Sequence, residues 1–131
     1  MVKELGLGKQ VLFLKKISQD LKNTLVAKSN IFVMPSVVYK KSVEGFGIAF
    51  VEAAQYGISS VGGKDGGACD AIIHDKTGLI IDGNNLEEIY QGIINLLSDK
   101  KYIEYGVSAK KSAEKFEWSK IIKKYLEIIK D

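Results

Sequence analysis

The segment "IFVMPSVVYKKSVEGFGIAFVEAAQYGISSVGG", residues 31–63, decides the fold. It begins with an apolar run over 31–36, which is typical of a buried strand, and ends with a second short strand over 58–63. Between the strands the pattern predicts a helix over 47–56, and Gly57 can end that helix in the left-handed conformation. Strand, helix and strand in this order predict two parallel strands joined by a helical crossover.

The same alternation continues outward in both directions. Upstream we expect a strand over 11–16 and a helix over 20–29. Downstream we expect a short helix near 68–73, a turn and strand within 74–82, and helices over 86–99, about 100–115 and 118–130. The predicted class is therefore α/β, with a Rossmann-like parallel sheet that carries helices on both faces.

Composition narrows the class of protein. With 131 residues, 46% of them hydrophobic and 27% charged, the chain fits one ordinary globular domain. No apolar run reaches the roughly 18 residues of a membrane span and no signal-peptide core follows the start, so we expect a cytoplasmic protein. All 19 basic residues are lysines, and the net charge is only +3. Because arginine is the residue that grips phosphate and guanine bidentately, nucleic-acid binding is disfavoured.

The glycines gather where such a fold binds ligands. Nine of the 13 lie between 45 and 83, in turns that follow predicted strands. The cluster "GGKDGGACD" at 62–70 matches neither a dinucleotide fingerprint nor a P-loop, so a dehydrogenase or ATPase is disfavoured; a tight turn with positive φ is the alternative. We expect His74 to be an exposed turn residue and Cys69 to be a small buried one. No metal-ligand spacing is present.

Two carboxylates mark the predicted helix at 47–56: Glu44 lies just before it and Glu52 lies within it. Glu52 falls in a stretch that is apolar almost all round, and a buried carboxylate must either be neutralised or meet hydrogen-bond donors such as ligand hydroxyls. Glu44 precedes Gly45 and Gly47, whose missing side chains let a ligand approach the backbone and the free amides of the helix. The alternative is structural: Glu44 helps to cap the helix, and Glu52 pairs with a lysine at the edge of the core.

A resemblance to a known family adds to this interpretation. The stretch "MPSVVYKKSVEGFGIAFVEAAQYG" resembles the signature of the retaining family-4 glycosyltransferases, which contains an E-x7-E motif. The likeness continues through "GGKDGGACDAIIHDKTGLIIDGNNLEEIYQGIINLLSD" and "FEWSKIIKKYLEII", and so covers nearly the whole chain. Within the family the chain most resembles the branch of phosphatidylinositol mannosyltransferases.

The resemblance implies the GT-B fold, in which the C-terminal of two Rossmann-like domains holds the nucleotide-sugar donor. It makes Glu44 the catalytic carboxylate beside the donor sugar, and it assigns Glu52 to the ribose hydroxyls. Contacts to the sugar and diphosphate come from Gly45, Phe46, Gly47 and Ile48, the last of which starts the helix that faces the phosphates. The family needs no metal ion or other cofactor.

Parts of the family pattern have no counterpart in the chain: the upstream Arg and Lys pair, the first strands of the donor domain and the acceptor domain. We therefore expect residues 1–131 to form one incomplete C-terminal donor domain that is inactive alone. The full enzyme would use a glycan or lipid-linked acceptor held by its N-terminal domain, in the cytoplasm or peripherally at the inner membrane face. The alternative function is a non-catalytic module that binds nucleotide sugar or pairs with a separate upstream half.

Overall fold

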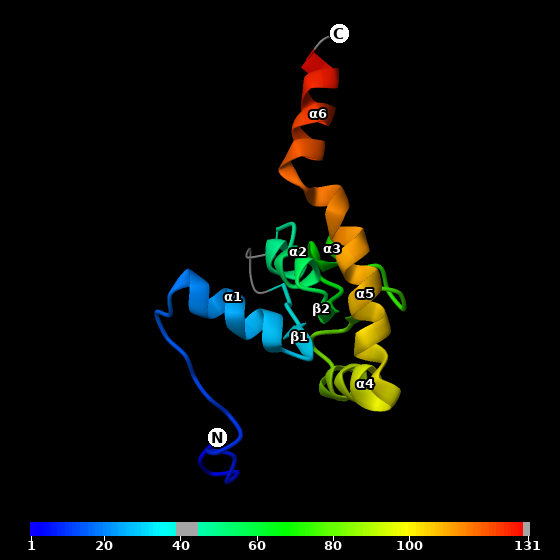
Figure 1. Ribbon diagram of the computed structural model, residues 1–131. Coiled ribbons are helices and arrows are strands. Elements are labelled where there is room, and N and C mark those ends of the chain that lie inside the picture. The colour runs from blue at the N-terminus through cyan, green and yellow to red at the C-terminus, as the bar shows by residue number, and fades with distance from the viewer. Residues whose placement is uncertain (39–44, 130–131) are drawn as a thin grey trace.

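A three-stranded parallel sheet forms the centre of the molecule (Figure 1). The computed structural model describes residues 1–38 and 45–129. Strands β1 (Ile31–Met34), β2 (Ser59–Gly63) and β3 (Gly78–Ile81) lie in the order β1-β2-β3, with Val61 level with Val33 and Leu79. The parallel sheet predicted from the alternation of strands and helices is confirmed.

Six α-helices accompany the sheet within the described residues. They are α1 (Gln19–Lys28), α2 (Ile48–Gln55), α3 (Ala68–Ala71), α4 (Leu86–Leu97), α5 (Lys101–Ala113) and α6 (Trp118–Ile129), with short 3-10 turns at Ser98–Lys100 and Glu114–Phe116. Each lies within a few residues of its predicted position. Asn85 caps α4, because its side chain accepts hydrogen bonds from the amides of Glu87 and Glu88.

Helices cover both faces of the sheet because side chains alternate along each strand. From β1, Phe32 and Met34 pack toward α2 and α3, whereas Ile31 and Val33 pack on the opposite face with α4 and α5. The first layer centres on Phe50, which is 1% exposed, and the second on Leu96. Helices on both faces were predicted, and they are present.

The prediction of a strand over 11–16 is wrong. These residues form no strand, and Leu12 and Phe13 are more than two-thirds exposed. A strand needs a neighbour for its N–H and C=O groups, and within residues 1–38 and 45–129 β1 pairs only with β2. The apolar pattern over 11–16 does not show whether such a neighbouring strand is present.

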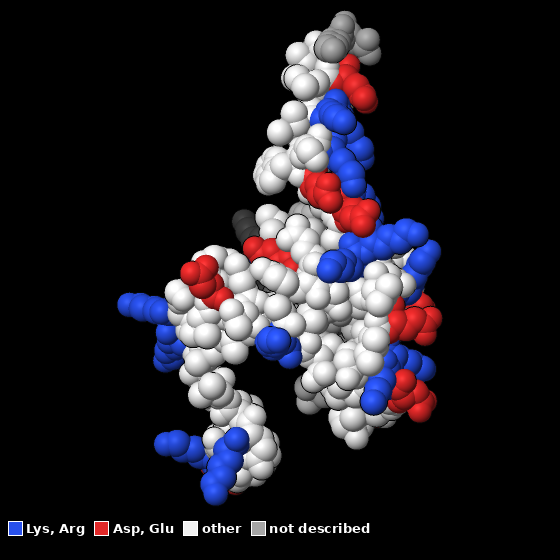
Figure 2. All heavy atoms as spheres, in the orientation of Figure 1, with Lys and Arg blue, Asp and Glu red and all other residues white. Residues whose placement is uncertain are grey.

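Helix α6 projects from the body, and the two termini lie at opposite ends of the molecule (Figure 1). Along α6, basic side chains gather on one side and uncharged ones on the other (Figure 2). Helical spacing puts Lys120, Lys123 and Lys124 on one face, and Trp118 is 76% exposed. These three lysines are exposed, which is typical of a solvated helix face. No helix in the described part of the chain has the length and apolar character needed to cross a membrane.

Candidate functional site

Helix α2 is set between two glycines in the left-handed conformation. Gly47 at its N-cap has φ +74°, and Gly57 just past its end has φ +75°. Ile48 is the first helical residue, as predicted, and Gly57 is the predicted terminator. Gly47 has no side chain with which to cap the helix, and no described side chain caps the first amides of α2.

The expectation that Glu52 is a carboxylate in the core is wrong. Phe50, Val51, Ala53 and Ala54 are buried, but Ile48, Glu52 and Gln55 follow one another on a stripe of α2 that is not. The Glu52 side chain is 46% exposed. The helix is apolar around most of its circumference, but neighbouring elements cover only one side of it. Water can therefore solvate the Glu52 carboxylate in the absence of a ligand.

Glu52 instead has an ion-pair partner from another helix. The Nζ atom of Lys22, in α1, donates to Oε2 of Glu52 at 2.9 Å. This is the arrangement expected from the structural alternative, in which Glu52 pairs with a lysine at the edge of the core. A carboxylate offers roughly four acceptor positions, so the pair leaves Glu52 able to accept from further hydroxyl groups.

Three of the predicted site residues line one cavity. Phe46, Ile48 and Glu52 form part of the wall of a hollow of about 540 Å³, together with Val51, Gln55, Phe116, Glu117, Trp118 and Ile121. The ring of Phe46 lies edge-on to that of Phe116, with centroids 5.2 Å apart. The wall is mostly apolar with a small number of polar groups, a composition common in small-molecule sites.

The two glycine-rich segments of the sequence meet in space. A Cβ atom at Gly67 would overlap the carbonyl oxygen of Gly45, and one at Gly47 would lie 3.4 Å from the carbonyl oxygen of Gly67. Gly67 has φ −73°, so it is close approach rather than left-handed backbone that requires glycine here. The cluster at 62–70 therefore seats the loop that precedes α2. The predicted need for positive φ holds at Gly66, with φ +124°.

Glycines also allow the segments that follow the strands to approach one another closely. Side chains at Gly63 and Gly83 would run into the backbone of Pro35 and Ser36, just after β1. Lys64, which follows β2, donates to Asp82, which follows β3, with 2.6 Å between Nζ and Oδ2. This bond raises the pKa of Lys64 and lowers the pKa of Asp82.

Neither His74 nor Cys69 lines the cavity beside Phe46, Ile48 and Glu52. His74 is exposed, as predicted, and its Nδ1 accepts from the amide of Ile80 at 2.9 Å. Cys69 is exposed, so the prediction of a buried cysteine is wrong; helix α3 is only four residues long and turns Ala68 and Ala71 inward instead. Glu44, the predicted catalytic carboxylate, lies outside the described residues.

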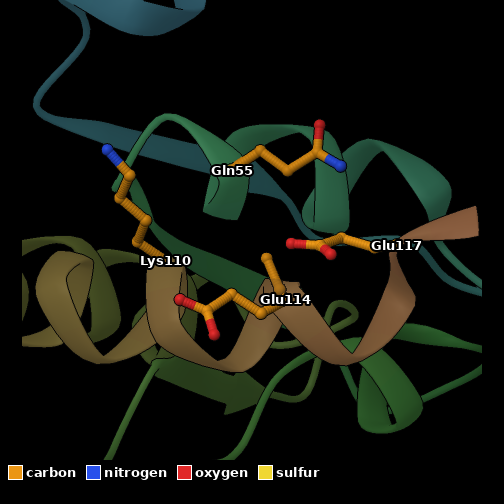
Figure 3. Close-up of a pocket in the computed structure, with 5 residues that line it drawn as sticks. Gln55, Lys110, Glu114 and Glu117 are labelled. Carbon is orange, nitrogen blue, oxygen red and sulfur yellow. The ribbon is translucent and has the colours of Figure 1, made fainter. Parts of the chain in front are cut away.

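A second cavity lies beside the C-terminal half of α2. It holds about 320 Å³ and is lined by Gln55, Lys110, Ala113, Glu114 and Glu117 (Figure 3). None of the predicted site residues lines this second cavity. It also touches none of the glycines at the other end of the helix. We therefore place the candidate site at the first cavity.

Comparison with known proteins identifies the class. Residues 1–116 match the family model described as "Glycosyl transferases group 1", so the chain belongs to this family. It is 31% identical over 103 residues to a GDP-mannose-dependent alpha-(1-6)-phosphatidylinositol monomannoside mannosyltransferase of Mycolicibacterium smegmatis, covering 77% of this chain and 27% of the relative. It is 32% identical over 104 residues to a probable sucrose-phosphate synthase of Oryza sativa, covering 78% of this chain and 10% of the relative.

Solved structures share the fold. The structure of Anabaena HepE in complex with UDP matches 98% of this chain and 34% of its own, with a TM-score of 0.85 and 24% identity. The C-terminal domain of a group 1 glycosyl transferase (LpcC) from Francisella tularensis matches 86% of this chain and 56% of its own, with a TM-score of 0.74 and 23% identity. The expected GT-B class is confirmed, and the chain spans about a third or less of the full-length relatives named here.

Lys22 is the residue of the site that sequence reasoning did not single out. It lies 30 positions before Glu52, and its helix turns Lys22 and Val26 partly inward while burying no residue fully. The structural alternative for Glu52 did predict that a lysine would pair with it. Nothing in the spacing chose among the 19 candidates.

Proposed function

We propose that the chain is the donor-binding C-terminal domain of a retaining glycosyltransferase, which holds a nucleotide-diphosphate sugar at the N-terminal half of α2. The observation that carries this proposal is the common cavity of Phe46, Ile48 and Glu52, beside a helix start that no described side chain caps. Membership of the group 1 family supports it. So does the fold shared with HepE, whose structures hold UDP, UDP-glucose, or UDP and glucose.

Different residues would bind different parts of the donor. The amides of Gly47 and Ile48 and the positive end of α2 face the diphosphate, where negative charge grows as the leaving group departs. Glu52 accepts from the ribose hydroxyls, and the backbone at Gly45 and Phe46 approaches the sugar. Glu44, directly before Gly45 in sequence, is the proposed catalytic carboxylate. The reaction is proposed to need no metal ion.

Transfer requires an acceptor, and we propose that a separate N-terminal domain of the full enzyme holds it. The chain covers only 27% of the mycolicibacterial relative and 34% of the HepE chain. The isolated chain would then bind donor without turning it over, and transfer of sugar to any acceptor by this chain alone would contradict that division. The name of the mycolicibacterial relative, a phosphatidylinositol monomannoside mannosyltransferase, supports a glycan or lipid-linked acceptor. We propose that the enzyme meets it in the cytoplasm or at the inner membrane face.

Replacing Glu52 by alanine tests the donor site. Loss of a charged acceptor of two hydroxyl hydrogen bonds is expected to weaken nucleoside-diphosphate binding about tenfold or more. Glu104→Ala serves as the matched control, since Glu104 is an exposed carboxylate on α5. Binding is measured by calorimetric titration with GDP and UDP, and equal affinities of the two variants would contradict the role of Glu52.

A further inference from the structure

We infer that Lys22 is a positioning residue, which holds the Glu52 carboxylate in the orientation that receives the donor's ribose. The inference rests on the proposed function, since it presupposes that Glu52 accepts from the ribose hydroxyls. Its starting point is the bond of 2.9 Å from Lys22 Nζ to Oε2 of Glu52, which joins α1 to α2. The same Glu52 side chain lines the cavity that also contains Phe46 and Ile48.

The exposure of the Lys22–Glu52 pair fits a role in orienting the Glu52 carboxylate better than a role in stabilising the fold. The two side chains are 37% and 46% exposed, and ion pairs with that much exposure contribute little to folding free energy. A glutamate on the surface of a helix is free to sample several rotamers, and ordering a flexible side chain on binding costs affinity. Lys22 reduces that cost, because its ion pair favours one orientation of the carboxylate before the ligand arrives.

The pair also leaves acceptor capacity in place. Lys22 engages Oε2, and the structure records no other hydrogen bond to the Glu52 side chain from the described residues. A neighbouring pair of ribose hydroxyls can therefore donate to Oε1 and to the remaining lone pair of Oε2. Removing the lysine keeps the acceptor but lets it move, so the loss falls on ligands that carry the hydroxyls.

Selectivity for intact ribose measures this role. The full chain is titrated with GDP, with UDP and with the 2′,3′-dideoxy form of each. For whichever diphosphate binds more tightly, the affinity of the natural form is divided by the affinity of its dideoxy form. Lys22→Met is expected to lower this ratio about three- to tenfold, which corresponds to one weakened hydrogen-bond set. Lys22→Arg should restore most of it. Lys28→Met, on the same helix and exposed, is the control and should leave the ratio unchanged.

The outcomes separate the inference from the proposed function. If Lys22→Met weakens the natural and dideoxy forms equally, or neither, Lys22 does not position Glu52 and the inference fails while the donor site stands. If Glu52→Ala leaves the ratio unchanged, the ribose role of Glu52 fails and takes the inference with it. Absence of saturable binding by the unsubstituted chain overturns both.

Discussion

Replacing Phe50 by alanine is expected to lower the free energy of unfolding by about 3 to 5 kcal/mol, the usual range for removing a buried aromatic side chain. Phe50 is 1% exposed and packs against Phe32 of β1 with ring centroids 5.5 Å apart, nearly perpendicular. It belongs to the layer that joins α2 and α3 to the sheet. Its ring also approaches Gly47, where a Cβ atom would lie 2.8 Å from Cδ2. The substitution therefore loosens both the core and the start of α2.

Urea unfolding followed by circular dichroism measures this loss. Phe13→Ala is the matched control, because Phe13 is 72% exposed and its removal should change stability by about 0.5 kcal/mol or less. Similar shifts in the two variants would show that Phe50 does not anchor the layer described here.

Replacing Gly67 by alanine is expected to cost about 3 kcal/mol, the upper end of the range for inserting a methyl group into a packed region. The added Cβ would overlap the carbonyl oxygen of Gly45 and crowd the backbone of Phe46. Backbone atoms do not move aside as a flexible side chain does, so the loop before α2 must shift. Because that loop is part of the proposed donor site, nucleoside-diphosphate affinity should fall together with stability.

The control for this substitution is Gly8→Ala. No atom lies within 4 Å of a Cβ built at Gly8, so its replacement should leave the urea midpoint nearly unchanged. A Gly67→Ala chain as stable as the Gly8→Ala chain would mean that the two glycine-rich segments do not touch. Reduced stability with unchanged nucleotide affinity would show that the contact is real but does not position the donor loop.

The sequence patterns predicted helices and strands well where these depend only on residues close together in the chain. The apolar run at β1, the short run at β2 and the glycine that ends α2 each depend on a few neighbouring residues, and each prediction holds. The strand expected over 11–16 failed because strand formation depends on a partner for the backbone, which an apolar pattern does not specify. Burial of Cys69 was expected from its residue type, but α3 turns Ala68 and Ala71 inward and leaves Cys69 exposed.

Sequence reasoning named residues that the structure brings together, and it was less accurate about their surroundings. Phe46, Ile48 and Glu52 do line one cavity. The burial of Glu52 was overestimated because the composition of a helix does not reveal how many of its sides are covered. The close approach of Gly67 to Gly45 and the pairing of Lys22 with Glu52 join residues more than 20 positions apart, and such contacts come from tertiary packing.

The most direct measurement of the central claim is a calorimetric titration of the unsubstituted chain with GDP-mannose, UDP-glucose and UDP-N-acetylglucosamine, each compared with its free nucleoside diphosphate. We expect saturable binding of one nucleotide series, with the free diphosphate retaining much of the affinity because α2 and Glu52 are proposed to contact the nucleotide portion. Failure of every nucleotide to bind, by a chain that unfolds cooperatively in urea, would contradict the claim that these residues form a donor site.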